Sequence, residues 1–238
     1  MLNEQELERY KRQIMLPGIG EEGQLKLKKA CVLIIGVGGL GSPVAIYLCA
    51  AGVGTLGLAD HDTVSMNNLQ RQILYNTDVV GESKTQHAKE FLESLNPEVS
   101  VHSISEKITA QNAAEIIRPY DIVVDATDNF GSRYLISKYC QELNKPMVHG
   151  AVEEFEGLVS VFNVQGGPVY EDLFPEPPTD VSQDGEPKGV FGPLPGVIGS
   201  LQSMEVLKLI TGVGNPICGK LITYNALTCS FNTLSFGD

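Results

Sequence analysis

The sequence predicts an α/β protein built on a doubly wound, mostly parallel sheet with an antiparallel extension at its C-terminal end. Short apolar runs alternate with longer stretches of helical periodicity up to residue 150, which is typical of strand–helix–strand units and a parallel sheet. After residue 150, strand candidates follow one another without crossover helices, which is typical of antiparallel pairing. The 238 residues are 42% hydrophobic, enough for one large core.

The part before residue 150 opens with apolar residues at helical spacing among charged ones, which predicts an amphipathic helix over 3–15, ended by Pro17 and Gly18. A short basic run at 26–29 precedes the first strand. Strands and helices then alternate. We predict strands over 31–35, 55–59, 99–104, 122–126 and 147–148, and helices over 42–51, 84–95, 110–117 and 132–143.

The part from 151 to 238 is expected to hold strands over 157–164, 221–224 and 230–235, and a helix over 199–211. Residues 166–196 contain seven of the 13 prolines, a composition that predicts a long exposed loop. We therefore expect one domain over 1–238, divided into parts 1–150 and 151–238.

Charge and composition exclude several kinds of partner. The formal net charge of -12 would repel a phosphate backbone or an anionic membrane, so we expect neither nucleic acid nor membrane as a partner. No apolar run approaches the roughly 20 residues that span a bilayer, and the polar start of the chain is unlike a signal peptide, so we expect a cytoplasmic protein.

The five cysteines, Cys31, Cys49, Cys140, Cys218 and Cys229, form no CxxC pair. This spacing fits neither a disulfide framework nor a zinc ribbon. Cys31 and Cys49 stand in apolar stretches, and we expect them to be buried thiols without chemistry.

A glycine-rich sequence, Gly36-x-Gly38-x-x-Gly41, follows the first strand and opens the first crossover helix. Its backbone N–H groups and the helix N-terminus can face a phosphate. Asp60, nineteen residues after Gly41 and at the end of the next strand, can accept hydrogen bonds from ribose hydroxyls. This pattern is Rossmann-like and makes 1–150 the nucleotide-binding part, but it would serve NAD, FAD or ATP.

A set of polar residues outside the glycine loop favours ATP. Chemistry at an α-phosphate needs cations, which Arg71 and Lys84 can supply, and a carboxylate for Mg²⁺, which Asp128 can supply. Each has an alternative interpretation: the two cations as solvated or ion-paired surface residues, and Asp128-Asn129 as the N-cap of the helix that follows.

The ordered motifs resemble those of the MoeB, ThiF and HesA adenylyltransferases, bacterial relatives of ubiquitin-activating enzymes, over nearly the whole chain. The motifs are Arg9-Tyr-x-Arg12-Gln13-Ile, the loop 36–41, Asp60-x-Asp62, Asn68-Leu-Gln-Arg71-Gln72, Gly81-x-x-Lys84, Asp125-Ala-Thr-Asp128-Asn129 and Pro195-Gly-Val-Ile-Gly199-Ser-Leu-Gln-x-Met-Glu205.

The resemblance implies that ATP and Mg²⁺ activate the C-terminal Gly-Gly carboxylate of a ubiquitin-like sulfur-carrier protein, with release of pyrophosphate, in thiamine, molybdopterin or related biosynthesis. It implies a homodimer in which Arg12 reaches the partner's nucleotide. The expected catalytic residues are Arg12, Arg71, Lys84 and Asp128, with Asp128 also binding Mg²⁺. The expected ATP-binding residues are Gly36, Gly38, Gly39, Gly41, Asp60, Asp62, Asn67, Asn68, Gln72 and Asn129.

Two departures from the family pattern limit this inference. The first zinc-binding pair of the family would fall near Val169 and Asp172, and no second pair precedes Asp238, so we predict no zinc. Residues 166–196 also lack the cysteine that many relatives carry there. We therefore expect the reaction to stop at the adenylate, without a covalent sulfur intermediate on the enzyme.

Three other functions remain open. Tyr134 and Lys138 have the YxxxK spacing of short-chain NAD-dependent oxidoreductases, although the glycine spacing is not that of the family. Relatives also activate a carboxylate on tRNA, which the acidic charge disfavours. The third is a scaffold that binds a carrier without turnover. For the carrier, we expect docking at the loop 166–196 and the apolar positions near Phe162, Val190 and Phe191.

Overall fold

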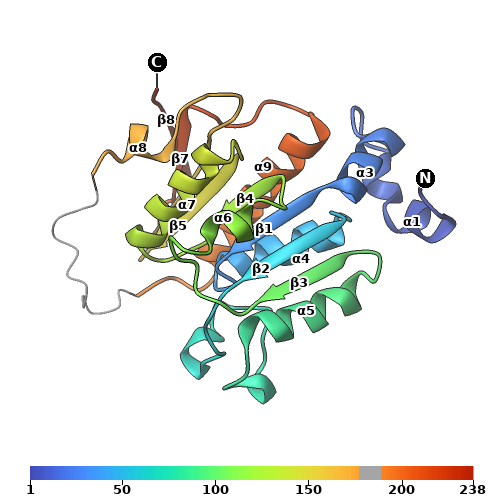
Figure 1. Ribbon diagram of the computed structural model, residues 1–238, viewed down its shortest axis with the longest axis horizontal. Helices are drawn as coiled ribbons and strands as arrows, with labels where there is room; N and C mark the ends of the chain where they lie inside the picture. The colour runs from blue at the N-terminus through green and yellow to red at the C-terminus, as the bar shows by residue number, and fades with distance from the viewer. Residues whose placement is uncertain (177–188, 238) are drawn as a thin grey trace.

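A computed structural model describes residues 1–176 and 189–237. It contains an eight-stranded sheet in the order β3-β2-β1-β4-β5-β6-β7-β8 (Figure 1). The first five strands in this order are parallel and the last three are antiparallel, which confirms the predicted fold class. The strands are β1 (Cys31–Ile35), β2 (Thr55–Ala59), β3 (Ser100–Ile104), β4 (Ile122–Asp125), β5 (Met147–Glu153), β6 (Glu156–Phe162), β7 (Lys220–Asn225) and β8 (Ser230–Ser235).

Helices cover both faces of the sheet, with α6 and α7 in front of it and α4 and α9 behind it in Figure 1. Successive strand residues point to opposite faces, so Val32 and Ile34 join one apolar core while Leu33 and Ile35 join the other. The helices are α1 (Glu4–Arg9), α2 (Lys11–Ile14), α3 (Gly20–Lys29), α4 (Gly41–Ala50), α5 (Lys84–Leu95), α6 (Ala113–Ile117), α7 (Phe130–Glu142), α8 (Tyr170–Leu173) and α9 (Leu194–Thr211), with 3-10 turns η1 (Met66–Asn68) and η2 (Thr77–Val79).

The strand order reverses at β1, because the chain first builds outward to β2 and β3 and then returns to add β4 on the other side. At such a switch point the connections after the two central strands leave toward opposite faces and open a crevice at the carboxyl ends of the strands. The loops that follow β1 and β4 both reach this crevice. The topology therefore predicts a ligand site between the glycine-rich loop and residues 126–129.

The prediction of one continuous N-terminal helix over 3–15 is wrong, because the segment divides at Tyr10 into two helices, α1 and α2. Tyr10 leaves helical geometry and is buried, and its hydroxyl accepts a hydrogen bond from Asn96 at 2.8 Å. The basic run at 26–29 belongs to α3, a helix that the sequence pattern missed. Its buried positions include Gly23 and Gln24, which carry no apolar signal.

The segment expected as an exposed loop over 166–196 is partly ordered and partly buried. Tyr170, in α8, is 1% exposed and packs edge-on against Phe162, with ring centroids 5.6 Å apart. Helix α9 begins at Leu194, five residues before the predicted start, with proline in its first turn as helices prefer. The middle of the predicted loop, 177–188, lies outside the described residues.

The glycine at position 199 lies inside α9, although the predicted helix began at this residue. A Cβ at this position would lie 2.7 Å from the Leu40 carbonyl oxygen and 2.5 Å from Pro43, so glycine permits the close packing of α9 on α4. A residue with low helix propensity is thus required inside the helix.

The five cysteines are free thiols. Cys49 and Cys140 are buried, and burial raises the pKa of the Cys49 thiol to about 12, which makes it unreactive at neutral pH. Cys31, expected to be buried, is only half-buried.

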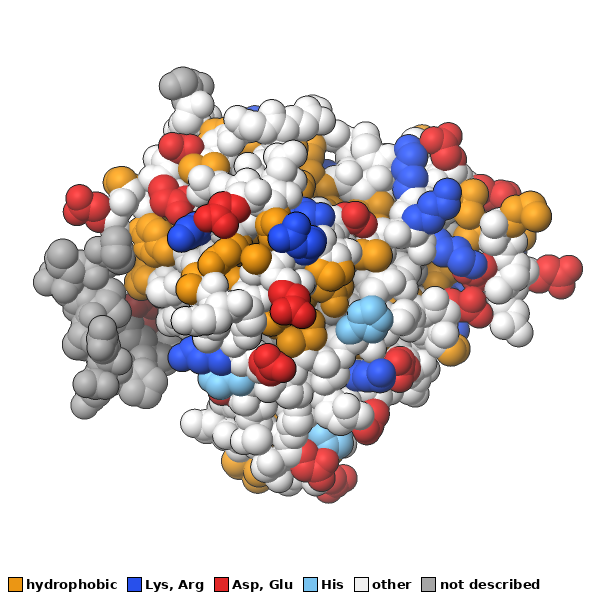
Figure 2. All heavy atoms as spheres, in the orientation of Figure 1, with side chains coloured by type: hydrophobic (Ala, Val, Ile, Leu, Met, Phe, Trp, Pro, Cys, Tyr) orange, Lys and Arg blue, Asp and Glu red, His pale blue; other side chains and the backbone are white. Residues whose placement is uncertain are grey.

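The face of the protein in Figure 2 carries Lys and Arg side chains scattered among Asp and Glu. Among the described helices, none is both long and apolar enough to cross a bilayer.

Candidate functional site

A cavity of about 310 Å³ opens at the carboxyl ends of the parallel strands, within the size range of small-molecule sites. The predicted site residues on its wall are Gly36, Gly38, Gly39, Asp60, Asp62, Arg71, Gln72, Lys84, Asp128 and Asn129. The predicted residues outside that wall are Arg12, Gly41, Asn67 and Asn68.

Two glycines of the loop are required by the fold. Gly36 has φ +91°, a left-handed conformation that favours glycine, and a Cβ there would lie 2.6 Å from the Ala126 carbonyl oxygen. A Cβ on Gly41 would overlap the carbonyl oxygen of Gly36. These two positions let β1, the loop and α4 pack together, which explains why Gly41 is absent from the cavity wall.

The other two glycines keep space open at the cavity. A Cβ at Gly38 would lie 3.4 Å from the Gln72 amide nitrogen, and one at Gly39 would lie 3.3 Å from both Arg71 and Pro195. Side chains here would therefore fill the space between the loop and the residues opposite. The loop therefore forms a cradle in which the phosphates of a ligand can closely approach the backbone N–H groups of the protein.

Hydrogen bonds fix the loop in this shape. Asp60 Oδ2 accepts the Val37 N–H at 2.8 Å, and the Tyr75 hydroxyl donates to the Val37 carbonyl at 2.7 Å. Ser42 donates its hydroxyl to the Gly38 carbonyl at 2.6 Å. Burial raises the pKa of the Tyr75 phenol, so it remains a donor. Asp60 thus organises the loop, and its remaining lone pairs can still accept ribose hydroxyls.

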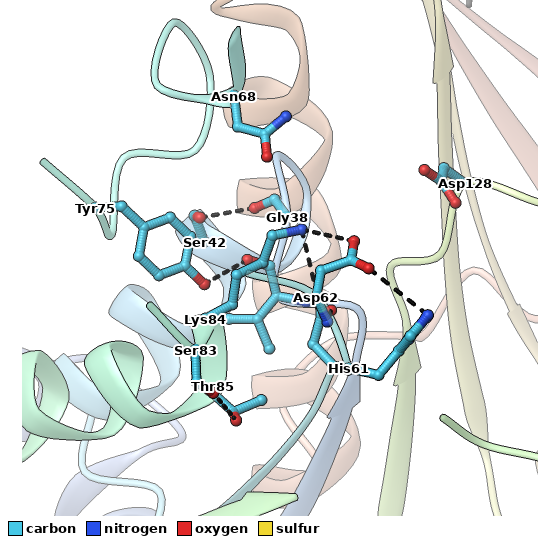
Figure 3. Close-up of polar contacts among 12 residues, drawn as sticks. Gly38, Ser42, His61, Asp62, Asn68, Tyr75, Ser83, Lys84, Thr85 and Asp128 are labelled. Carbon is cyan, nitrogen blue, oxygen red and sulfur yellow. Dashed lines mark hydrogen bonds and ion pairs between the residues drawn. The ribbon is translucent and has the colours of Figure 1, made fainter. Parts of the chain in front are cut away.

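Lys84 is buried and bound by carboxylates from the end of β2 (Figure 3). Its ammonium lies 2.9 Å from Asp62 Oδ2 and 3.9 Å from Asp60 Oδ2. Burial opposes ionisation of Asp62, but the hydrogen bond and charge of Lys84 hold its pKa below the usual value. The alternative interpretation of Lys84 as a solvated or ion-paired surface residue is correct about the ion pair but wrong about the surface, since the residue is 4% exposed.

Arg71 is half-buried at the cavity wall and donates to the Asn67 carbonyl at 3.2 Å. Asn68 donates its amide to the side chain of Asn67 at 3.1 Å, so this pair orders the turn that carries Arg71. Gln72 is 5% exposed, and its side-chain oxygen is buried without a hydrogen-bond partner among the described residues.

Asp128 lies on the opposite side of the cavity from Lys84 and Asp62 (Figure 3). It is exposed, and its carboxylate accepts a hydrogen bond from the Asn129 amide at 3.4 Å. Asn129 is the N-cap of α7, where its side-chain oxygen accepts the Ser132 N–H at 2.9 Å. The N-cap interpretation is therefore confirmed for Asn129, while the Asp128 carboxylate stays open to a cation.

Several residues of the wall were missed by sequence reasoning. With them, the wall carries four cations (Arg71, Lys84, Lys107, Arg133) and four carboxylates (Asp60, Asp62, Glu106, Asp128), and also His61, Val152 and Pro195. Glu106 and Lys107 follow β3, so the rule that ligands bind at carboxyl ends of strands was a usable signal. Arg133 lies inside a helix and had no such signal.

A buried acid–base pair lies next to the cavity at the end of β4. Asp125 and His149 are 0% and 1% exposed, and His149 Nδ1 lies 2.7 Å from Asp125 Oδ2. Burial lowers the pKa of His149, which is therefore a neutral donor at pH 7. Burial opposes ionisation of Asp125, but the hydrogen bonds from His149 and Thr127 and the nearby charge of Arg133 hold its pKa low.

Two other predicted features lie away from the cavity. Arg12 is exposed on α2, near α3 and the amino end of β1, so it is at the other end of the sheet from its own cavity. Tyr134 donates to the Phe174 carbonyl at 2.7 Å, and Lys138 is exposed beside Glu142. Neither Tyr134 nor Lys138 is on the cavity wall, which weighs against the oxidoreductase.

An open parallel sheet with a glycine cradle at its switch point defines a Rossmann-like nucleotide-binding protein. The model of the ThiF family matches residues 10–237. The chain belongs to the ThiF family.

Curated relatives and solved structures agree with this assignment. The sulfur carrier protein adenylyltransferase of Thermus thermophilus is 49% identical over 97% of this chain and 88% of its own length. The probable molybdopterin-synthase adenylyltransferase of Porphyra purpurea is 46% identical over 95% of this chain, which spans only 60% of that relative. A crystal structure of E. coli MccB with ATP has a TM-score of 0.87 and 26% identity, over 99% of this chain and 72% of that one.

Proposed function

We propose that this protein uses ATP to adenylate the C-terminal glycine carboxylate of a ubiquitin-like sulfur-carrier protein. The observation that carries the proposal is the convergence of the Gly38–Gly39 cradle, Arg71, Lys84 and Asp128 on one cavity. The names of the relatives supply the substrate class, since they adenylate sulfur carriers or serve molybdopterin synthase.

The reaction forms a bond between a carboxylate oxygen of the carrier and the α-phosphorus of ATP. The bond from that phosphorus to the bridging oxygen of the β-phosphate breaks, and pyrophosphate leaves with the electron pair. A carboxylate is already ionised at pH 7, so the site needs cations and positioning groups more than a base. Arg71 and Lys84 supply positive charge at the wall, and the glycine cradle admits the phosphates.

Mg²⁺ binds through one or two carboxylates together with water and substrate phosphates. Asp128 fits this need, because its carboxylate faces the cavity and has no ion pair among the described residues. When bound there, the ion would neutralise phosphate charge. Asp62 fits less well, since Lys84 already pairs with its carboxylate at 2.9 Å. Asp60 fits less well because it accepts the Val37 N–H and lies near the same ammonium.

The expected homodimer gains support from Arg12. Because Arg12 lies at the far end of the sheet from its own cavity, any role at a nucleotide requires a second copy of the chain. We propose that Arg12 enters the partner's cavity, as the family resemblance implies.

The expected carrier-docking surface cannot include Phe162. Phe162 is 1% exposed within the core and cannot contact a partner. Phe191 is 51% exposed and its ring lies 5.7 Å from that of Phe155, which is 41% exposed. This pair lies next to the end of β5, whose Val152 is on the cavity wall. We propose that the carrier body packs on Phe155 and Phe191 while its tail enters the cavity.

The test of docking is Phe191→Ser, which should raise the carrier KM by about tenfold, the effect of losing one buried aromatic contact, and leave the ATP KM unchanged. Phe91→Ser is the matched control, because Phe91 is 43% exposed on α5. Equal carrier KM values for the two variants would contradict this surface.

The test of the function itself is ATP–pyrophosphate exchange with purified carriers that end in Gly-Gly. We expect exchange with at least one carrier and none with the same carrier lacking its last glycine. Exchange that depends on tRNA would favour the tRNA-carboxylate activity, and tight NAD binding without exchange would favour the oxidoreductase. ATP and carrier binding without exchange would favour the scaffold.

A further inference from the structure

The buried pair of Asp125 and His149 lies beside the cavity, and neither residue is on its wall. Burying a carboxylate is costly unless hydrogen bonds satisfy it. Asp125 makes three through its side chain: one with His149 Nδ1 at 2.7 Å, and two from Thr127, whose N–H and hydroxyl donate at 3.1 and 2.7 Å. Two of these three hydrogen bonds come from the backbone turn that follows β4, and the third comes from His149 on β5.

The turn in question carries Asp128. Its preceding residue, Thr127, is bound by Asp125 on one side, while Arg133 donates to the Thr127 carbonyl at 3.3 Å on the other. The N–H, the hydroxyl and the carbonyl of Thr127 are thus all engaged. Asp128 itself has no comparable restraint, so its direction depends on the residue before it.

His149 is held as firmly as the carboxylate it binds. It lies opposite Asp125 in the β4–β5 pairing, and its ring packs edge-on against Tyr170 at 5.1 Å and near Phe162 at 6.2 Å. Gln202 from α9 ties the same strand ends together by donating to the Asp125 carbonyl at 2.9 Å. The imidazole therefore presents Nδ1 to Asp125 in one orientation.

We propose that His149 is a positioning residue that acts through Asp125 and Thr127 to hold Asp128 toward the cavity for adenylyl transfer. The catalytic half of this statement rests on the proposed function. The structural half, that His149 orders residues 126–129, stands independently of the reaction.

The test compares two substitutions of similar size. His149→Asn keeps an N–H donor near the position of Nδ1, whereas His149→Leu removes the donor and leaves Asp125 Oδ2 without a partner. Loss of an outer-shell partner that orients a metal-binding residue typically costs about 10- to 100-fold in activity. For His149→Leu we expect a kcat loss of that size in pyrophosphate exchange, an ATP KM within about threefold, and faster hydrogen–deuterium exchange of amides 126–129. His149→Asn should restore both readouts to within about threefold of wild type.

Asn163→Gly is the control for general destabilisation. Asn163 is 9% exposed, has φ +57°, and donates to the carbonyls of Cys140 and Lys145 at 2.9 Å each. Its loss should lower the unfolding temperature but change neither kcat nor exchange at 126–129. If His149→Leu proves insoluble, Asp125→Asn tests the same link, with the same losses expected.

Wild-type amide exchange at 126–129 in His149→Leu would overturn the proposal, as would an equal kcat loss in Asn163→Gly. If the wild-type protein shows no pyrophosphate exchange with any carrier, the proposed function fails. The amide exchange then still decides whether His149 orders the turn.

Discussion

The ammonium group of Lys84 lies 2.9 Å from Asp62 Oδ2, although Lys84 is the first residue of a helix. A cation at a helix N-terminus is disfavoured by the helix dipole. Lys84 is also buried, with only 4% of its surface exposed to solvent. The carboxylates at the end of β2 hold it there. An anionic ligand must compete with Asp62 for this cation, so the pair is a preorganised and exchangeable binding element.

Lys84→Ala should lower pyrophosphate exchange by about 100-fold, because one preorganised charge contact to a transition state is worth that much. Lys89→Ala is the matched control, since Lys89 lies on the same helix and pairs with Glu93 at 3.5 Å. Steady-state exchange rates for both proteins check the prediction. Equal exchange rates for Lys84→Ala and Lys89→Ala would show that Lys84 has no role in the reaction.

Substitutions of Gly41 and Gly38 should have different effects, the first on stability and the second on ATP binding. Gly41→Ala should destabilise the protein by about 2 kcal/mol or more, because its Cβ overlaps the Gly36 carbonyl. Gly38→Ala should fold with a nearly normal unfolding temperature but bind ATP at least about tenfold more weakly, because its Cβ enters the cradle. Thermal unfolding and ATP titration separate the two effects. A stable Gly41→Ala protein with weak ATP binding would reverse the assignment.

The proposed dimer makes a prediction about mixed subunits. Arg12→Ala and Asp128→Ala should each be inactive alone, but a mixed dimer has one site with Asp128 from one chain and Arg12 from its partner. Free mixing in equal amounts gives half mixed dimers, each with one working site of two, so about one quarter of wild-type activity should return. Refolding the variants together and assaying exchange checks this. No recovery would place Arg12 outside the partner's site.

Stability should fall with acidification below about pH 6.5, the ordinary pKa of histidine. The folded state lowers the pKa of His149, so the unfolded chain binds more protons in this range and acid favours unfolding. His149→Asn removes this group, and its stability should therefore depend less on pH between about 6.5 and 5. Denaturant unfolding at several pH values measures the slope. An unchanged slope would mean that His149 is not buried neutral.

The sequence predicted the parallel half of the fold well because each strand is a short apolar run between helices. It predicted part of the cavity wall for the same reason, since Gly38, Asp60 and Asp128 lie within three residues after predicted strands. The alternation rule says nothing about a helix such as α3, whose buried positions include Gly23 and Gln24.

Residues that act through the fold were harder to predict. Tyr75 and Ser42 order the glycine loop from positions with no motif of their own. His149 lies within a predicted strand, and only the β4–β5 register brings it against Asp125. Such contacts depend on strand register and side-chain packing, which a single sequence does not encode locally.

The proposed reaction adenylates a carrier's C-terminal carboxylate in the cavity that holds Arg71, Lys84 and Asp128. Intact-mass spectrometry of a Gly-Gly carrier incubated with the protein, ATP and Mg²⁺ tests it most directly. We expect a carrier population heavier by one adenylyl group with the wild-type protein and none with Asp128→Ala, whose exposed side chain can be lost without unfolding. An unmodified carrier with the wild-type protein, or equal adenylation by Asp128→Ala, would contradict it.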